Sequence, residues 1–172
     1  MKSILCVLVV CSFLLSPAWA GEDVVHRSQA TNLQSNGWHL AQSTEGEFSV
    51  LVPWPFWDTT INATTPMYTI ISASRHGTTY TAILIPKGTQ PGVFETFESD
   101  LANPNMEVGQ YQGHTTIYGV DSTEEDGFKM KNHTKRIKTE SGIYILMVVS
   151  LVQNERPPDI EKFFKSLMFP RI

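Results

Sequence analysis

Cysteine is nearly absent from this chain of 172 residues. The two cysteines, Cys6 and Cys11, both lie within the first twenty residues. The rest of the chain therefore has no disulfide, no thiol nucleophile and no thiolate metal site. A domain without such cross-links depends on its hydrophobic core, and this chain is long enough to bury one.

The chain also has only a small excess of acidic over basic residues, and it has few long apolar runs. The chain has 13 Lys and Arg against 17 Asp and Glu, and the net charge of −4 is too mild to indicate nucleic-acid binding. A hydrophobic content of 41% excludes a disordered tail. After the first twenty residues no apolar run reaches the length of a membrane span, so we expect no transmembrane segment in the mature chain.

Motifs for catalysis and cofactor binding are missing as well. The five histidines show no metal-ligand spacing, and the chain has neither a G-x-S-x-G elbow nor a glycine loop for phosphate. We therefore predict no catalytic residue, no cofactor and no metal, and we expect that the protein is not an enzyme. The remaining possibility for an enzyme is an active site that the fold assembles from distant loops.

The first twenty residues have the form of a secretory signal peptide. Lys2 is followed by an apolar run from Ile4 to Leu15 and by the small-x-small pattern Ala18-Trp19-Ala20. We predict cleavage after Ala20 and a bacterial periplasmic or secreted location. Lipidation at Cys11 fits less well, because the residue before it, Val10, is not small.

After the signal peptide we predict a flexible lead-in over residues 21–37 and one domain over residues 38–172. Patterns of β-branched and aromatic residues predict strands over residues 38–42, 48–52, 65–74, 79–85, 115–120, 128–138 and 143–152. Apolar residues at helical spacing predict helices beginning near Pro91 and Pro157. In the second helix the apolar stripe is formed by Ile160, Phe163, Phe164 and Leu167.

Two of these strands indicate how the sheet is covered by other elements. Residues 143–152 are apolar at both alternations, which predicts a strand covered on both faces. Residues 128–138 place Lys129, Lys131, His133 and Lys135 on one face, which predicts a strand near an edge or without cover.

Several short motifs follow one another in a distinctive order. They are Gly46-Glu47-Phe48-Ser49-Val50 running into Pro53, the strand Ser141–Leu146, and Phe163-Phe164-Lys165-Ser166-Leu167. Over roughly Trp38 to Phe169 the chain thereby resembles the PsbP and DcrB-like superfamily of bacterial secreted proteins. The resemblance implies an α+β fold, an α/β/α sandwich whose twisted, mostly antiparallel sheet has helices packed on both faces. It also implies a non-enzymatic accessory role, and it transfers no functional residue.

Pro53-Trp54-Pro55-Phe56-Trp57 places three large aromatic residues among prolines. Because proline cannot donate to a sheet ladder, we predict a stiff loop here. Exposed aromatic clusters mark recognition surfaces, so Trp54, Phe56 and Trp57 are candidate binding residues. Alternatively, Trp54 and Phe56 cap the open end of the domain and only Trp57 is exposed.

Lys129, Lys131 and Lys135 are the second set of candidate binding residues. On a strand they face one side, where they could meet an acidic partner or anionic lipid headgroups. They could instead discourage edge-to-edge aggregation. The acidic residues of 121–127 lack the ligand spacing of a calcium loop, and we interpret them as a solvated connection between strands.

Taken together, these features predict a non-catalytic periplasmic accessory or protein-interaction domain that binds an unidentified envelope protein. The alternative is a carrier or sensor of a small hydrophobic ligand, which would need an enclosed apolar cavity.

Overall fold

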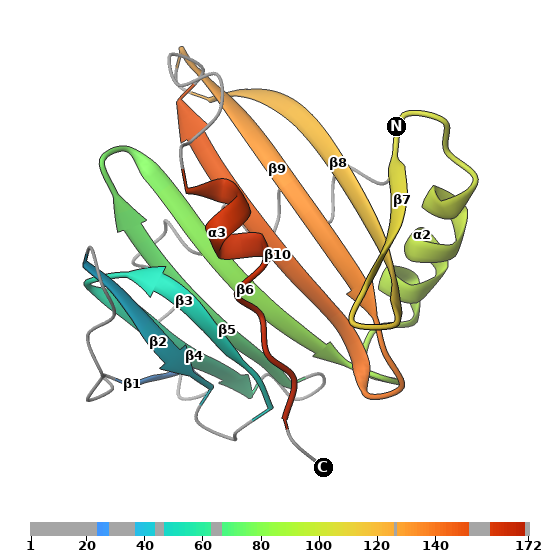
Figure 1. Ribbon diagram of the computed structural model, residues 1–172, viewed down its shortest axis with the longest axis horizontal. Coiled ribbons are helices and arrows are strands. Elements are labelled where there is room, and N and C mark those ends of the chain that lie inside the picture. Colours follow the sequence, from blue (N-terminus) through green and yellow to red (C-terminus); the bar gives the residue numbers. More distant parts are fainter. Residues whose placement is uncertain are drawn as a thin grey trace.

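An antiparallel sheet dominates the computed structural model, which describes residues 24–27, 37–43, 47–62, 67–125, 127–151 and 159–170. In this part of the chain the sheet has eight strands, ordered β1–β4–β5–β6–β10–β9–β8–β7 (Figure 1). The strands are β1 (Val24–Arg27), β4 (Phe56–Asn62), β5 (Met67–Arg75), β6 (Thr78–Pro86), β7 (Glu107–Tyr111), β8 (His114–Glu125), β9 (Phe128–Lys138) and β10 (Gly142–Leu151).

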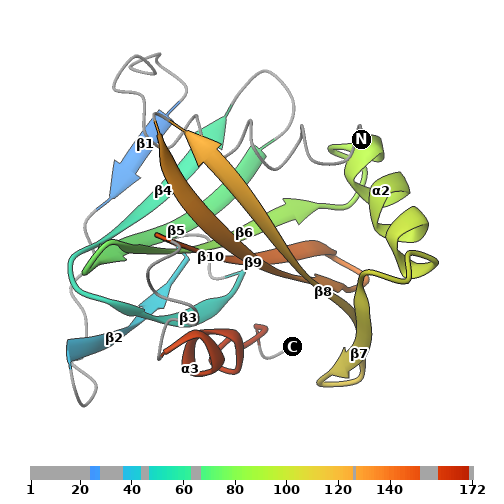
Figure 2. The ribbon, with the colours of Figure 1, turned by 90° about the horizontal axis from the view of Figure 1, so that it is seen from above.

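A small second layer covers one face of this sheet, which we call the front face. It consists of the hairpin β2 (Trp38–Gln42) and β3 (Ser49–Pro53) together with α3 (Ile160–Phe164). Figure 2 shows α3 and the hairpin on one side of the sheet and α2 (Pro91–Leu101) on the other, at one end. We call the side that bears α2 the rear face.

The predicted α/β/α sandwich is therefore wrong, and the fold is mostly β. In the described residues the two helices have only eleven and five residues. The apolar stripe of the C-terminal helix is buried as predicted, but α3 ends at Phe164. Leu167 is buried from an extended segment, because Met168 forms an antiparallel bridge with Ser49 of β3. A hairpin and one short helix thus provide the cover expected from a helical layer.

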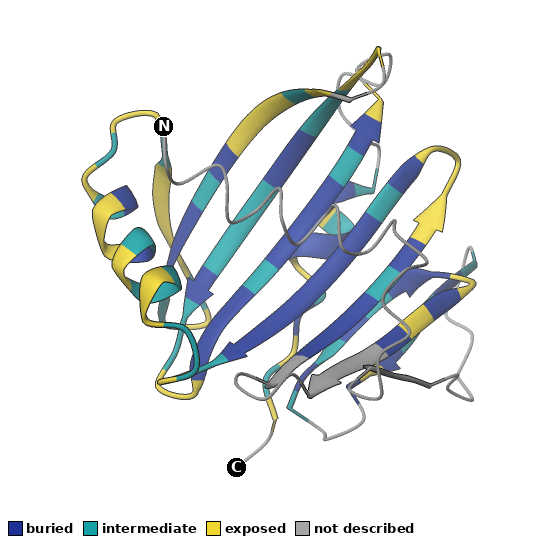
Figure 3. Cartoon of the chain, turned by 180° about the vertical axis from the view of Figure 1, so that it is seen from behind, coloured by how far each residue is buried: buried dark blue, intermediate teal, exposed yellow. Residues whose placement is uncertain are grey.

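The core is divided between the two faces. The larger cluster fills the space between the sheet and the front layer and includes Trp38, Tyr80, Leu146 and Phe163. Smaller clusters on the rear face lie under α2, one of them with Ile143 of β10. The prediction that residues 143–152 are covered on both faces is confirmed over residues 143–150, whereas Leu151 is exposed and residue 152 lies outside the described residues. Figure 3 shows the rear face, where the central strands are buried or half-buried along most of their length.

Strand β9 corrects a second prediction, since it lies between β10 and β8 and not near an edge. Its front face is covered even though it carries lysines, with His133 only 4% exposed and Ile137 fully buried. Lys131 and Lys135 are half-buried there, and the Lys135 ammonium lies over the ring of Tyr111 on β7. A polar pattern therefore did not mean a bare strand.

Other boundaries also differ from the prediction. The strands expected over residues 65–74 and 79–85 correspond to β5 and β6, which pair as a hairpin with a φ of +72° at Gly77 in its turn. Residues 121–125, expected in a loop, extend β8 and pair with β9. Val24–Arg27, expected in the lead-in, pairs with β4. The predicted signal peptide lies outside the described residues, among which no helix has the length and apolarity needed to cross a membrane.

Candidate functional site

The aromatic segment forms the corner between β3 and β4. Strand β4 begins at Phe56, so the predicted loop is shorter than expected. Phe56 is 4% exposed and belongs to the front core, whereas Trp54 is 51% and Trp57 59% exposed. Neither alternative from the sequence is correct as a whole, because Phe56 caps the core while both tryptophans face solvent.

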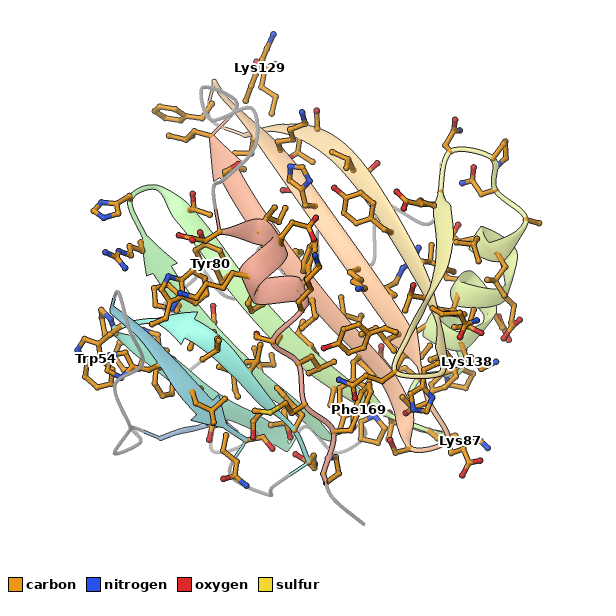
Figure 4. All side chains as sticks on the ribbon, viewed as in Figure 1. Trp54, Tyr80, Lys87, Lys129, Lys138 and Phe169 are labelled. Carbon is orange, nitrogen blue, oxygen red and sulfur yellow. The ribbon has the colours of Figure 1, made fainter. Side chains whose placement is uncertain are left out.

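Neighbouring rings support Trp54 from two sides. Its ring centroid lies 5.1 Å from that of His39 on β2 and 5.7 Å from that of Phe56, in a T-shaped contact with the latter. Its backbone N–H donates to the Gly37 carbonyl at 3.4 Å, and the Trp54–Pro55 peptide bond is cis. Figure 4 places Trp54 at the margin of the molecule. A large ring supported in this way offers contact area at a small cost in conformational entropy.

Trp57 points to the rear face, because side chains alternate along a strand and Phe56 points to the front. It pairs with Ser72 of β5, which in turn pairs with Thr81 of β6. The hydroxyl oxygens of Ser72 and Thr81 are 3.2 Å apart. The exposed indole of Trp57 therefore borders a short row of hydroxyl groups.

The three lysines of β9 lie on the front face with different degrees of exposure. Lys129 is exposed, whereas Lys131 and Lys135 are half-buried. The Lys135 ammonium lies 4.5 Å from the ring centroid of Tyr111, which is a cation–π contact. Burial lowers the pKa of Lys135, and the carboxylate of Glu161 on α3 opposes that shift.

The two sets of candidate residues do not form one site. The register Trp57–Ser72–Thr81–Met147–Thr134 places Trp57 on the face of Thr134, opposite to that of Lys135. Strands β5, β6 and β10 separate β4 from β9, which corresponds to about 19 Å at the usual strand spacing. Trp54 and Lys129 lie in different parts of the molecule in Figure 4.

A polar pair on the front face of the large sheet was missed from the sequence. The ring nitrogen Nδ1 of the buried His133 lies 2.7 Å from the Tyr118 hydroxyl, and the two rings stack. The spacing of Lys131, His133 and Lys135 had indicated their common face, but not that β8 would bring Tyr118 beside them. Among the residues that the structure describes, no group of three or more His, Cys, Asp or Glu side chains could hold a metal ion.

Comparison with known proteins identifies no family for this chain. No protein-family model matches it, and no curated protein matches it. A solved structure from Pseudomonas aeruginosa, PA94, is of a protein of unknown function. It matches with a TM-score of 0.41 and 13% identity, over 78% of this chain and 98% of the other.

Proposed function

We propose that this protein is a non-catalytic, secreted interaction domain of the bacterial envelope, and that it binds a protein partner through Trp54 and Trp57. The first twenty residues support secretion, since they carry the order of features that a signal peptidase recognises. The sequence motifs of common nucleophilic and phosphate-binding enzymes are missing.

The exposure of the two indoles is the observation that carries the proposal. Both are more than half exposed, although tryptophan is usually buried for most of its area. The rings of Phe56 and His39 both contact Trp54, so the orientation of this indole is fixed before binding. Tryptophan in such a position is a typical hot spot of protein interfaces, where single truncations cost about 2 kcal/mol or more.

The test is capture of a partner from the envelope fraction by the tagged chain after cross-linking, identified by mass spectrometry. The W54A/W57A variant is expected to lose a stoichiometric partner that the parent chain retains. Its melting temperature should change by only a few degrees, because neither indole belongs to the core clusters.

The matched control is F128A, which removes an equally exposed ring, at 63%, on β9. This variant should capture the partner as the parent chain does. Equal capture by W54A/W57A and the parent chain would contradict the proposed surface. A bare protein that retains a small molecule in native mass spectrometry would favour the carrier function instead.

A further inference from the structure

Strand β7 forms an edge of the large sheet (Figure 1). Within the described part of the chain it pairs on one side only, with β8. Residues 107–110 are exposed, and Val108 is 50% exposed. Edge strands are commonly protected against pairing with another chain by proline, lysine or a bulge. The sequence Glu-Val-Gly-Gln-Tyr contains neither proline nor lysine, and its register with β8 is continuous.

The hairpin that joins β7 to β8 determines which backbone groups of β7 point outward. Its loop has two residues, Gln112 and Gly113, with φ of +50° and +82°, as in a type I′ turn. In such a hairpin the residues that flank the loop, here Tyr111 and His114, exchange both backbone hydrogen bonds. Because this pattern alternates along the ladder, the N–H and C=O groups of Val108 and Gln110 point away from β8.

We infer that β7 is a self-association edge, which pairs antiparallel with β7 of a second copy of this chain about a two-fold axis at Gly109. In this register Val108 of each copy faces Gln110 of the other. Their four outward N–H groups and four outward C=O groups can then form four hydrogen bonds. Gly109 faces its own counterpart in a pair without hydrogen bonds, where the backbones approach most closely and a missing Cβ favours contact.

Charge complementarity favours a second copy over an unrelated strand. The same register places Glu107 opposite Tyr111 of the other copy, on the front face. Within each copy the Lys135 ammonium lies 4.5 Å from the ring of Tyr111. Glu107 already raises the pKa of Lys135 within its own copy, through the row Glu107–Tyr118–Lys135. In the dimer each Glu107 would also approach the half-buried Lys135 of the other copy, and the two-fold symmetry would form this added contact twice.

The contact is short, so the dimer should be weak. Five residues on each side bury less area than the interface of a stable complex, which removes about 1,200–2,000 Å² from water. We expect a monomer–dimer equilibrium in which the dimer becomes detectable above a protein concentration of about 10 µM.

The test is sedimentation velocity of the chain without residues 1–20 over about 1–500 µM. Val108→Pro removes an outward N–H and no bond to β8, so the dimer dissociation constant should rise at least about tenfold. Val108→Thr keeps that N–H and should leave the constant within about twofold. Glu107→Lys should weaken the dimer, and adding Lys135→Glu should restore it.

Hydrogen exchange gives a second measurement that does not depend on the folding of the proline variant. The amides of Val108 and Gln110 should become more protected as the concentration of the unmodified chain increases. Purely monomeric behaviour over the whole range would overturn the inference. So would a dimer that forms equally well with Val108→Pro, because such a dimer would use another surface.

Discussion

At the scale of single residues, Tyr80 gives the clearest dependence of stability on pH. Its ring lies in the front core, 5.3 Å from Trp38 and 5.5 Å from Phe163 between centroids. Burial, with a smaller contribution from Asp159, raises the pKa of Tyr80 to about 12, against the effect of Arg75. The folded protein therefore holds this phenol neutral at pH values where the unfolded chain has begun to ionise it.

We predict that the free energy of unfolding does not respond to Tyr80 below about pH 10 and falls between about pH 10 and 12. The shift of roughly two pKa units limits the loss to about 2–3 kcal/mol. The free energy of unfolding of Tyr80→Phe should fall less over this pH range. Part of the fall should remain, because burial also raises the pKa of Tyr111 and of Tyr144. Urea unfolding at pH 9 and 11.5 measures this difference, and identical losses would contradict it.

Residue patterns singled out the aromatic segment but left the exposure of Trp54 open, and they did not predict the strand that carries Trp57. Among the side chains of β4 that the structure describes, Phe56 and Asp58 face the front, and Asp58 is fully buried. An acidic residue at a buried position hides the alternation from which a strand is recognised. The prolines at 53 and 55 interrupt the pattern as well, so the sequence indicated a loop where a strand begins at Phe56.

At the scale of elements, an ion pair joins α2 to the sheet. The Arg136 guanidinium of β9 donates to the Asp100 carboxylate at 2.6 Å, and both side chains are about nine-tenths buried. Lys138 and Glu98 make a second ion pair between the same two elements, but these side chains are largely exposed. The two pairs therefore differ mainly in burial, which makes each a control for the other.

Removal of one partner from the buried pair should be far more costly than removal from the exposed pair. Asp100→Ala leaves Arg136 charged in a buried position and should cost about 3–5 kcal/mol of unfolding free energy. Glu98→Ala should cost less than about 1 kcal/mol. Chemical denaturation of both variants gives the comparison. Equal effects would mean that the Asp100–Arg136 pair is hydrated in solution.

The sequence predicted elements best where one face is apolar and the other polar. The helix Pro91–Leu101 follows such a pattern and is confirmed, whereas β6 was predicted from its run of β-branched and aromatic residues, although both of its faces are buried. Strand β7 was missed because four of its five residues are exposed, which leaves no buried alternation to detect. Strand β9 was placed near an edge because its lysines look solvent-facing in sequence, whereas the ammonium of Lys135 lies over the ring of Tyr111, which β7 provides.

At the scale of the whole molecule, strand patterns did not determine which layer each strand joins. Strands β2 and β3 look like any hairpin in sequence, yet they form a separate two-stranded sheet that belongs to the front layer. Local periodicity records which face of a strand is covered, but not by what. Periodicity therefore predicted most of the double-sided burial of β10 but not that a hairpin would supply the cover, and the helical layers of the sandwich came from the resemblance alone.

The same arrangement separates the two surfaces for which we propose partners. Trp54 and Trp57 lie at the start of β4, whereas β7 is the edge strand six strand spacings away, or about 29 Å. Changes at sites this far apart with no shared contacts are usually additive. Partner binding and self-association should therefore be energetically independent.

We predict that W54A/W57A leaves the dimer dissociation constant within about twofold and that Val108→Pro leaves partner capture unchanged. A variant that combines W54A/W57A with Val108→Pro should lose both partner capture and dimerisation. Capture and sedimentation on the same preparations measure the two losses. Loss of partner capture in Val108→Pro would mean that the partner binds the dimer. In that case the tryptophans of both copies would contribute to one assembly, and capture would increase with protein concentration as the dimer forms.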